Sequence, residues 1–173
     1  MYERRAQQAM QGFYWLIEGM LGASGRPGGP EKNITDQATL LAAVERDLAW
    51  LRAEGIGAVL SLTETPLPDQ ALAHQGLAWL HLPVPDLHAP TPAQLREALG
   101  FIDAQRAEGR EVVVHCLVGQ GRTGTVLAAY LIRSGMTPDA AIARLRELSP
   151  GAISAQEQVD ALHAYAKRRD WFV

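Results

Sequence analysis

Cys116 is the only cysteine among the 173 residues, and its position indicates chemistry rather than packing. It follows the apolar run EVVVH (residues 111–115), typical of a buried strand, and precedes a glycine-rich turn that leads into a helix. In an open α/β sheet, ligands bind beyond the carboxyl ends of the strands, where such a turn begins. Cys116 is therefore predicted to lie at a binding site, although a lone buried cysteine is more often a packing residue.

The turn after Cys116 has the composition of an anion-binding loop. Its backbone N–H groups can point inward, and the following helix adds the positive end of its dipole. Gly119 and Gly121 would let the backbone approach an oxyanion and adopt positive φ angles. The predicted phosphate-binding residues are Leu117, Val118, Gly119, Gln120, Gly121 and Arg122.

Arg122 lies six residues after Cys116 and can fold back over the mouth of this loop. Its planar guanidinium binds two oxygens of a tetrahedral dianion, which a lysine does not do. The positive surroundings would keep the cysteine as a thiolate at neutral pH. A thiolate below a phosphate, with an arginine to stabilise the equatorial oxygens, is suited to phosphoryl transfer onto sulfur.

Alternating strand and helix patterns must position this loop. Strands are predicted at 58–62, 79–84 and 111–115. Helices are predicted from Thr35 to Gly55, within 68–76, from Thr91 to Gly109, from Arg122 to Ser134, from Thr137 onward and after Ser154. This order predicts an α/β fold with a mostly parallel central sheet of four to five strands and helices on both faces.

Local signals define several of these helices. The first one is expected to bury one face, formed by Leu40, Leu41, Val44, Leu48 and Leu51. Thr91, Pro92 and Gln94 predict a capping box at the start of the third predicted helix, from Thr91 to Gly109. Ser154 with Glu157 predicts the cap of the last helix.

The N-terminal part is the least regular. The apolar segment Phe13–Leu21 is expected to form an edge hairpin, and residues 22–33, rich in glycine and proline, are interpreted as a loop inside the domain. A length of 173 residues with 47% hydrophobic composition fits one domain over residues 1–173. Residues 1–12 would form an N-terminal segment that is a candidate extension.

Composition argues against several partners. The formal charge of −3 and the lack of a basic stripe give no reason to expect nucleic acid. No segment is long and apolar enough for a signal peptide or a membrane span, so a soluble cytoplasmic protein without a membrane partner is expected. One cysteine forms no internal disulfide, and no Cys/His spacing indicates a metal site. We expect no cofactor, and a monomer, although the sequence does not define the oligomeric state.

The segment HCLVGQGRTGT (residues 115–125) resembles the HCxxGxxR(S/T)G signature of the cysteine-dependent phosphatases. The chain is similar to small atypical dual-specificity phosphatases of the VHZ-like type, because SLTE (61–64), PVPD (83–86), PGAI (150–153) and a later EQ fall in matching order. The resemblance covers most of the chain from about Phe13 onward. It implies that Cys116 is the nucleophile, that Arg122 binds phosphate and that His115 shapes the loop and tunes the thiolate. Thr123 would hydrogen-bond the sulfur and make it a better leaving group.

Expulsion of an alkoxide or phenolate also requires a proton donor. The resemblance implies an aspartate in a loop before the signature, and the candidates are Asp69, Asp86 and Asp103. Asp103 lies within a predicted helix, and Asp69 follows Pro68 at a helix start, where an acidic residue is expected for the dipole alone. Asp86 lies in the proline-rich loop PVPDLHAPTP after a strand and is the preferred acid, with His88 as an alternative acid or a solvent-facing histidine.

The same resemblance places a polar residue of the last helix near the phosphate. Gln158 matches that position better than Gln156, and either side chain is otherwise expected to be exposed. VHZ-like proteins carry an acidic residue after PGxI, where this chain has Ser154, so a second acid from that segment is not implied.

The expected activity is hydrolysis of phosphomonoesters through a cysteinyl-phosphate, with phosphate or vanadate-like oxyanions binding at the site. Leu117, Val118 and Gln120 add no positive charge to the loop, which favours a phosphorylated protein or peptide over a highly anionic lipid or polyphosphate. Phosphotyrosine is expected first, with phosphoserine and phosphothreonine as further substrates. The alternatives are a phosphatase of small metabolites, phosphoinositides or RNA ends, and a phosphate-binding module without turnover.

Overall fold

The structure is a computed structural model that describes residues 9–30 and 36–168. Its elements, in chain order, are β1 Tyr14–Ile17, β2 Leu21–Ser24, α1 Gln37–Ala53, β3 Ile56–Ser61, α2 Asp69–His74, β4 Ala78–His81, α3 Pro92–Ala107, β5 Glu111–His115, α4 Gly121–Arg133, α5 Pro138–Leu148 and α6 Gln156–Arg168. Residues 1–8 of the predicted N-terminal segment, 31–33 of the predicted loop and Thr35 lie outside the described residues.

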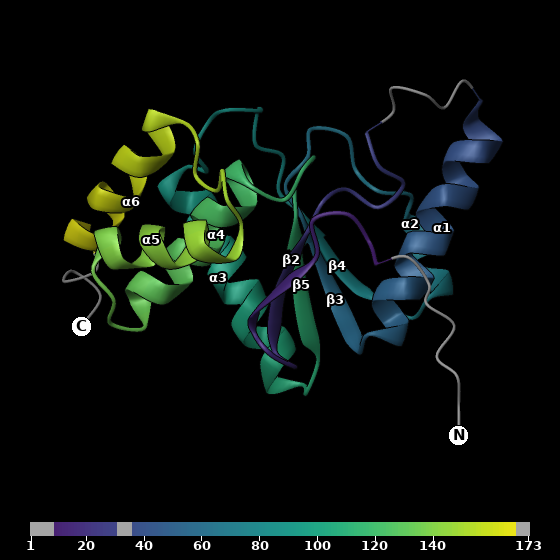
Figure 1. The fold of residues 1–173 in the computed structure, drawn as a ribbon. Helices are drawn as coiled ribbons and strands as arrows, with labels where there is room; N and C mark the ends of the chain where they lie inside the picture. Colours follow the sequence, from purple (N-terminus) through teal and green to yellow (C-terminus); the bar gives the residue numbers. More distant parts are fainter. Residues whose placement is uncertain (1–8, 31–35, 169–173) are drawn as a thin grey trace.

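The strands form one five-stranded sheet in the order β1-β2-β5-β3-β4. Strands β2, β5, β3 and β4 run parallel, and β1 pairs antiparallel with β2 at one edge. Helices α1 and α2 cover one face of the sheet, while α3, α4, α5 and α6 lie on the other (Figure 1). The predicted α/β class is thus confirmed.

Strand β5 occupies the centre of the sheet because its sequence suits burial on both faces. Val112, Val113 and Val114 are completely buried. Val112 and Val114 face the core cluster beneath α3 and α4, and Val113 faces the smaller cluster beneath α1. Such β-branched side chains on both faces are what a parallel strand covered by two helical layers requires.

The predicted hairpin is present, but the loop that follows is shorter than expected. Residues 21–24 (LGAS) form β2 and pair with β5 along its length, from Leu21 opposite Val112 to Ser24 opposite His115. Their interpretation as the start of a loop was wrong because pairing with the central strand outweighs the low strand propensity of glycine. Within the predicted N-terminal segment, Met10 is buried and Gln11 accepts the Gly25 N–H through its carbonyl at 3.0 Å.

The helix signals were mostly correct. The capping box of α3 is formed by Thr91 and Gln94. In α1, Val44, Leu48 and Leu51 are buried as predicted. Leu41 is 40% exposed, which corrects its assignment to the buried face: it lies at the margin of the apolar stripe rather than over the sheet.

A row of polar side chains marks the carboxyl ends of the parallel strands. The register places Ser24 and Ser61 on either side of His115, and His81 beside Ser61. The turns that leave this edge therefore meet in one place, as expected for a parallel sheet.

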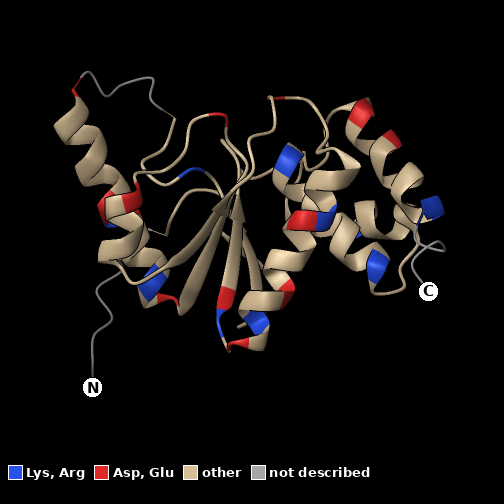
Figure 2. Cartoon of the chain, turned by 180° about the vertical axis from the view of Figure 1, so that it is seen from behind, with Lys and Arg blue, Asp and Glu red and all other residues tan. Residues whose placement is uncertain are grey.

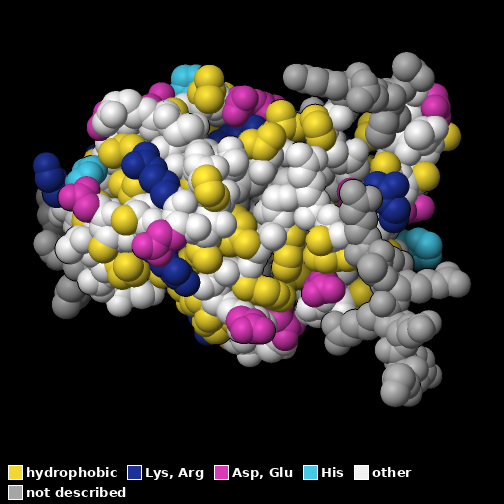
Figure 3. Space-filling view, in the orientation of Figure 1, with side chains coloured by type: hydrophobic (Ala, Val, Ile, Leu, Met, Phe, Trp, Pro, Cys, Tyr) yellow, Lys and Arg dark blue, Asp and Glu magenta, His cyan; other side chains and the backbone are white. Residues whose placement is uncertain are grey.

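Charged residues of both signs are scattered over the helices and turns (Figure 2). On the face seen in Figure 3, acidic and basic side chains lie among hydrophobic ones. Within the described residues, no helix is long and apolar enough to cross a membrane.

Candidate active site

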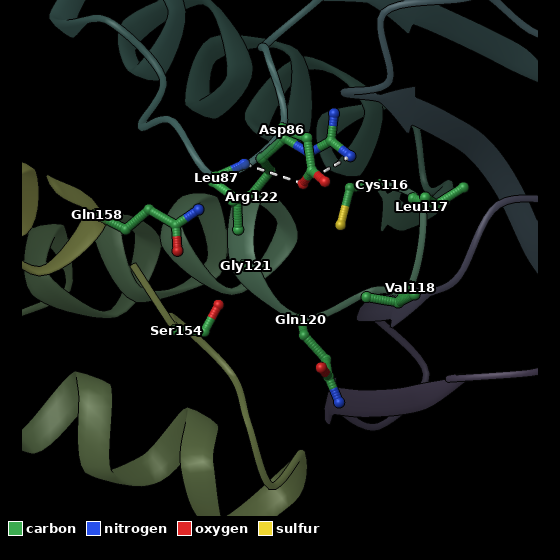
Figure 4. A pocket seen from close by; sticks show the side chains of 10 residues that line it. All are labelled: Asp86, Leu87, Cys116, Leu117, Val118, Gln120, Gly121, Arg122, Ser154 and Gln158. Atoms are coloured by element: carbon green, nitrogen blue, oxygen red, sulfur yellow. Dashed lines mark hydrogen bonds and ion pairs between the residues drawn. The ribbon is translucent and has the colours of Figure 1, made fainter. Parts of the chain in front are cut away.

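A pocket lies at the carboxyl edge of the sheet and gathers the residues predicted to do chemistry (Figure 4). It is lined by Asp86, Leu87, Cys116, Leu117, Val118, Gln120, Gly121, Arg122, Ser154 and Gln158. Cys116, directly after β5, directs its sulfur into the pocket, although the residue is only 2% exposed. A thiol at the base of a pocket meets an incoming substrate from one direction only, as an in-line displacement requires.

The loop from Cys116 to Arg122 is braced by the segment after β2. Arg26 donates its backbone N–H to the Leu117 carbonyl at 3.0 Å. Gly119 has φ +79°, and a Cβ there would lie 2.6 Å from the Ser24 carbonyl oxygen. Only glycine meets both demands, because the φ angle and the close approach each disfavour a side chain. Gly119 thus lets the back of the loop pack against the end of β2, and it does not itself line the pocket.

Gly121 is favoured by side-chain packing rather than by the predicted positive φ. Among the glycines of this loop only Gly119 has a positive φ, so the expectation of a left-handed conformation at Gly121 was wrong. A Cβ at Gly121 would instead meet the Gln158 side chain, with Nε2 at 2.9 Å. The absence of a side chain here lets α6 pack directly against the start of α4.

Arg122 points inward and is fixed on the side of the pocket opposite the loop. Its Nη1 donates to the Val84 carbonyl at 2.8 Å and to Glu64 Oε2 at 2.9 Å, and the side chain is 2% exposed. Its Nε is buried and makes no hydrogen bond to the described residues. A buried guanidinium N–H without an acceptor is costly in free energy, and a phosphate oxygen would satisfy it.

His115 is completely buried directly behind the nucleophile. Its Nδ1 lies 3.2 Å from the Cys116 carbonyl, which can only accept, so Nδ1 carries the proton. Nε2 then accepts from the Ser61 hydroxyl at 2.7 Å. Burial, with smaller contributions from the nearby Arg26 and Arg122 charges, lowers the pKa of His115 to about 4. The histidine is therefore neutral and holds the Cys116 peptide by a hydrogen bond.

Thr123 is completely buried at the start of α4. Its Oγ1 makes no hydrogen bond to the described residues, so the predicted bond to the Cys116 sulfur is not formed in this structure. Among the described residues, five buried side-chain polar atoms have no partner, and two of them are the Thr123 hydroxyl and Arg122 Nε. These two atoms belong to consecutive residues of the signature.

Asp86 is the only one of the three aspartate candidates that lines the pocket. Its Oδ1 lies 3.4 Å from Arg122 Nη2 and accepts the Leu87 N–H at 2.9 Å. Asp103 forms a two-point ion pair with Arg133 on the helical face, and Asp69 is exposed in the first turn of α2. The geometry thus brings Asp86, and not its alternatives, to the side of Cys116.

The loop around Asp86, residues 83–90, is held by side chains from four other segments, one of them Arg122, which donates to the Val84 carbonyl. Glu64 Oε1 accepts the Asp86 N–H at 2.8 Å, and Gln94 Nε2 donates to the Pro83 carbonyl at 2.8 Å. Glu157 and Gln158 contact His88 and Ala89 at the far end. We call residues 83–90 the acid loop.

The start of α6 differs from its predicted cap. Gln158, and not Ser154 with Glu157, makes the local capping contact: its Oε1 accepts the Ala155 N–H at 3.3 Å. Gln158 is 1% exposed and lines the pocket, whereas Gln156 is exposed and contacts Asp160. His88 is half exposed, outside the pocket lining, and pairs with Glu157.

Glu64 and Ser61 are site residues that the sequence pattern did not predict. Glu64 joins the two halves of the site, because its two oxygens contact Asp86 and Arg122. Partial burial alone would raise the pKa of Glu64, but hydrogen bonds from its own N–H, from Arg122 and from Asp86 lower it overall. The available signal was the position of SLTE directly after a strand that ends at the same sheet edge as Cys116.

Comparison with known proteins agrees with this geometry. A family model described as "Polymorphic toxin system, DSP-PTPase phosphatase" matches residues 35–136, which include Asp86, Cys116 and Arg122. The chain belongs to this DSP-PTPase phosphatase family. It therefore belongs to the dual-specificity and tyrosine phosphatase superfamily.

The relatives of this chain carry the names of different activities. The chain is 30% identical over 139 residues to the phosphatidylglycerophosphate phosphatase PTPMT2 of Arabidopsis thaliana, a match that covers 76% of this chain and 61% of that protein. It is 38% identical over 90 residues to mouse dual specificity protein phosphatase 2, covering 51% and 27% of the two chains. The crystal structure of Tk-PTP in the active form superposes with a TM-score of 0.75 at 32% identity, covering 91% and 97%. The chain thus spans about three-fifths or less of these two curated relatives.

Proposed function

We propose that this phosphatase hydrolyses phosphotyrosine in proteins or peptides, with phosphoserine and phosphothreonine as slower substrates. The observation that supports an aryl ester substrate is the apolar character of the pocket rim. Leu87 and Val118 are 64% and 48% exposed, two of the four large hydrophobic side chains most exposed on the described residues, and both line the pocket. Among the described residues that line the pocket, Arg122 is the only cation. A flat apolar group beside a single phosphate suits such a rim better than a polyanion.

In the proposed reaction, the Cys116 thiolate attacks phosphorus and an S–P bond forms while the ester P–O bond breaks. Asp86 donates its proton to the departing oxygen. The backbone of residues 117–122 and the Arg122 guanidinium bind the three equatorial oxygens. Water then attacks phosphorus, Asp86 takes a proton from it, and the S–P bond breaks to release phosphate and the thiolate. Phosphate and vanadate-like oxyanions would bind at the same place.

A second candidate substrate is phosphatidylglycerophosphate, and one observation favours it. The 30% identical PTPMT2 bears the name of that activity, and an apolar rim also suits a lipid ester. The expected order is nevertheless phosphotyrosine first, because the rim residues Leu117, Val118 and Gln120 carry no positive charge for an additional phosphodiester.

The test is a comparison of kcat/KM for a phosphotyrosine peptide, its phosphoserine counterpart and phosphatidylglycerophosphate in mixed micelles. We expect the phosphotyrosine peptide to be hydrolysed fastest, and a faster lipid reaction would replace the proposal with the second candidate. Cys116→Ser should lower turnover of p-nitrophenyl phosphate by more than about 10³-fold. It should still bind tungstate, measured by calorimetry. Retained turnover by this variant would refute the cysteinyl-phosphate route.

A further inference from the structure

The acid loop depends on two adjacent residues at the start of α6. The Glu157 carboxylate contacts the loop twice: Oε2 lies 3.0 Å from His88 Nδ1, and Oε1 accepts the Ala89 N–H at 3.2 Å. Gln158 Nε2 donates to the His88 carbonyl at 3.2 Å. Three contacts thus join the loop to a helix about 70 residues later in the chain.

The segment that these contacts hold is strained. Leu87 has φ 63°, a left-handed conformation that is costly for a leucine. This residue donates its N–H to Asp86 Oδ1 at 2.9 Å, so the strained peptide is the one that orients the acid. A loop in this conformation persists only where its surroundings fix it. Glu64 fixes it on the Asp86 side, and Glu157 fixes it on the other side of Leu87.

We propose that Glu157 is a positioning residue for the proton donor, acting through His88 and Ala89 on Asp86. The inference rests on the proposed function, because it assigns Asp86 as the acid. Glu157 does not line the pocket. The ion pair alone is weak, since both side chains are more than half exposed. The backbone N–H of Ala89 makes the contact effective, because it fixes the chain itself rather than a flexible side chain.

A glutamate in the first turn of a helix also stabilises that helix through the dipole. The two roles predict different kinetics. A helix-stabilising residue would affect all substrates equally. A residue that positions the acid matters most when the leaving group needs protonation, so phenyl phosphate should be more sensitive than p-nitrophenyl phosphate.

The experiment measures kcat/KM of the full chain for both esters in Glu157→Ala, Glu157→Gln and the matched control Asp160→Ala. Asp160 is an exposed carboxylate of the same helix. Glu157→Ala should lower kcat/KM about five- to tenfold for phenyl phosphate and less than about twofold for p-nitrophenyl phosphate. Glu157→Gln, which keeps one acceptor, should fall between Ala and wild type. Asp160→Ala should change neither ester.

A second measurement repeats Glu157→Ala in the Asp86→Asn background. If Glu157 acts through Asp86, the substitution should cost nothing further there. An equal loss on both esters, or a loss that persists in the Asp86→Asn background, would overturn the proposal. His88→Ala removes the His88–Glu157 contact from the side of the acid loop. It should lower kcat/KM by a smaller factor, again more for phenyl phosphate than for p-nitrophenyl phosphate. This variant keeps the test valid if Glu157→Ala folds poorly. Absence of turnover of either ester by the wild type would instead refute the proposed function.

Discussion

The phosphate loop and the acid loop face the same pocket but are built in different ways. At the phosphate loop, residues 116–122, the side chains of His115, Cys116, Arg122 and Thr123 are at most 2% exposed, and only Val118 at the rim is strongly exposed. A backbone hydrogen bond from Arg26, just after β2, braces the turn. In the acid loop, the Asp86 side chain is 63% exposed. Its start is held by the bond from the Val84 N–H to the Leu62 carbonyl and by Arg122, and the remaining contacts come from side chains of Glu64, Gln94, Glu157 and Gln158.

The difference follows from what each loop has to do. The phosphate loop must present fixed donors to an anion, and fixed donors reduce the reorganisation needed in the transition state. The acid loop carries one proton donor, which must face leaving groups of different shape. The comparison predicts that damage to the phosphate loop lowers the rate for every ester. Damage to the acid loop should instead depend on the leaving group.

Among substitutions that leave the nucleophile in place, Arg122→Lys should have the largest effect. Lysine keeps the charge but loses the planar two-point contact and the bonds to the Val84 carbonyl and Glu64. We expect kcat/KM to fall about 10²- to 10³-fold, by the same factor for phenyl and p-nitrophenyl phosphate. Steady-state kinetics with both esters checks this. A loss confined to phenyl phosphate would mean that Arg122 acts mainly on Asp86, with which it also pairs.

The buried histidine of the phosphate loop predicts a pH dependence of stability. The pKa of His115 is about 4 in the folded protein and about 6.5 when unfolded, so the unfolded chain binds a proton first as the pH falls. The stabilising contribution of neutral His115 is therefore present above pH 6.5 and is lost between pH 6.5 and 4. A shift of this size corresponds to roughly 3 kcal/mol as an upper limit.

Urea unfolding of the wild type and His115→Asn between pH 7 and 4.5 measures this contribution. The free energy of unfolding should fall more steeply with acid in the wild type than in the variant. His74→Asn is the matched control, because His74 is exposed at the end of α2 and should leave the slope unchanged. Parallel slopes for the wild type and His115→Asn would show that His115 is not held neutral.

The same contrast explains which parts of the molecule the sequence could predict. The phosphate loop is contiguous, so Cys116, the glycines and Arg122 could be assigned from residue types and spacing alone. The strand of valines and the Thr91 capping box are equally local signals. The β2 strand was missed because its pairing partner, β5, lies about 90 residues later and no local preference indicates it.

The acid loop could be predicted only in part. Proline-rich composition and position after a strand indicated Asp86, but its supports come from segments far away in the chain. Glu64 lies 22 residues before Asp86 and 58 before Arg122. Glu157 was predicted as a helix cap, which its residue type allows, whereas its contacts are with the acid loop. The sequence alone does not show that Glu64 and Glu157 contact the acid loop, because these contacts depend on how β3, β4 and α6 are placed relative to one another.

Glu64 connects the two loops and gives the sharpest test of the comparison. Its carboxylate accepts from the Asp86 backbone through one oxygen and from Arg122 through the other. A glutamine has one acceptor and cannot serve both. Glu64→Gln should therefore lower kcat/KM about threefold for p-nitrophenyl phosphate, through Arg122, and about tenfold for phenyl phosphate, through Arg122 and Asp86 together.

Glu108→Gln is the matched control, because Glu108 pairs with Arg110 at a similar exposure but contacts no residue of the pocket. This pattern differs from that expected for Arg122→Lys, which lowers both rates equally, and for Glu157→Ala, which spares the activated ester. If Glu64→Gln spares p-nitrophenyl phosphate entirely, Glu64 belongs to the acid loop alone. The rigidity of Arg122 then comes from the Val84 carbonyl, and the two loops are coupled through Arg122 rather than through Glu64.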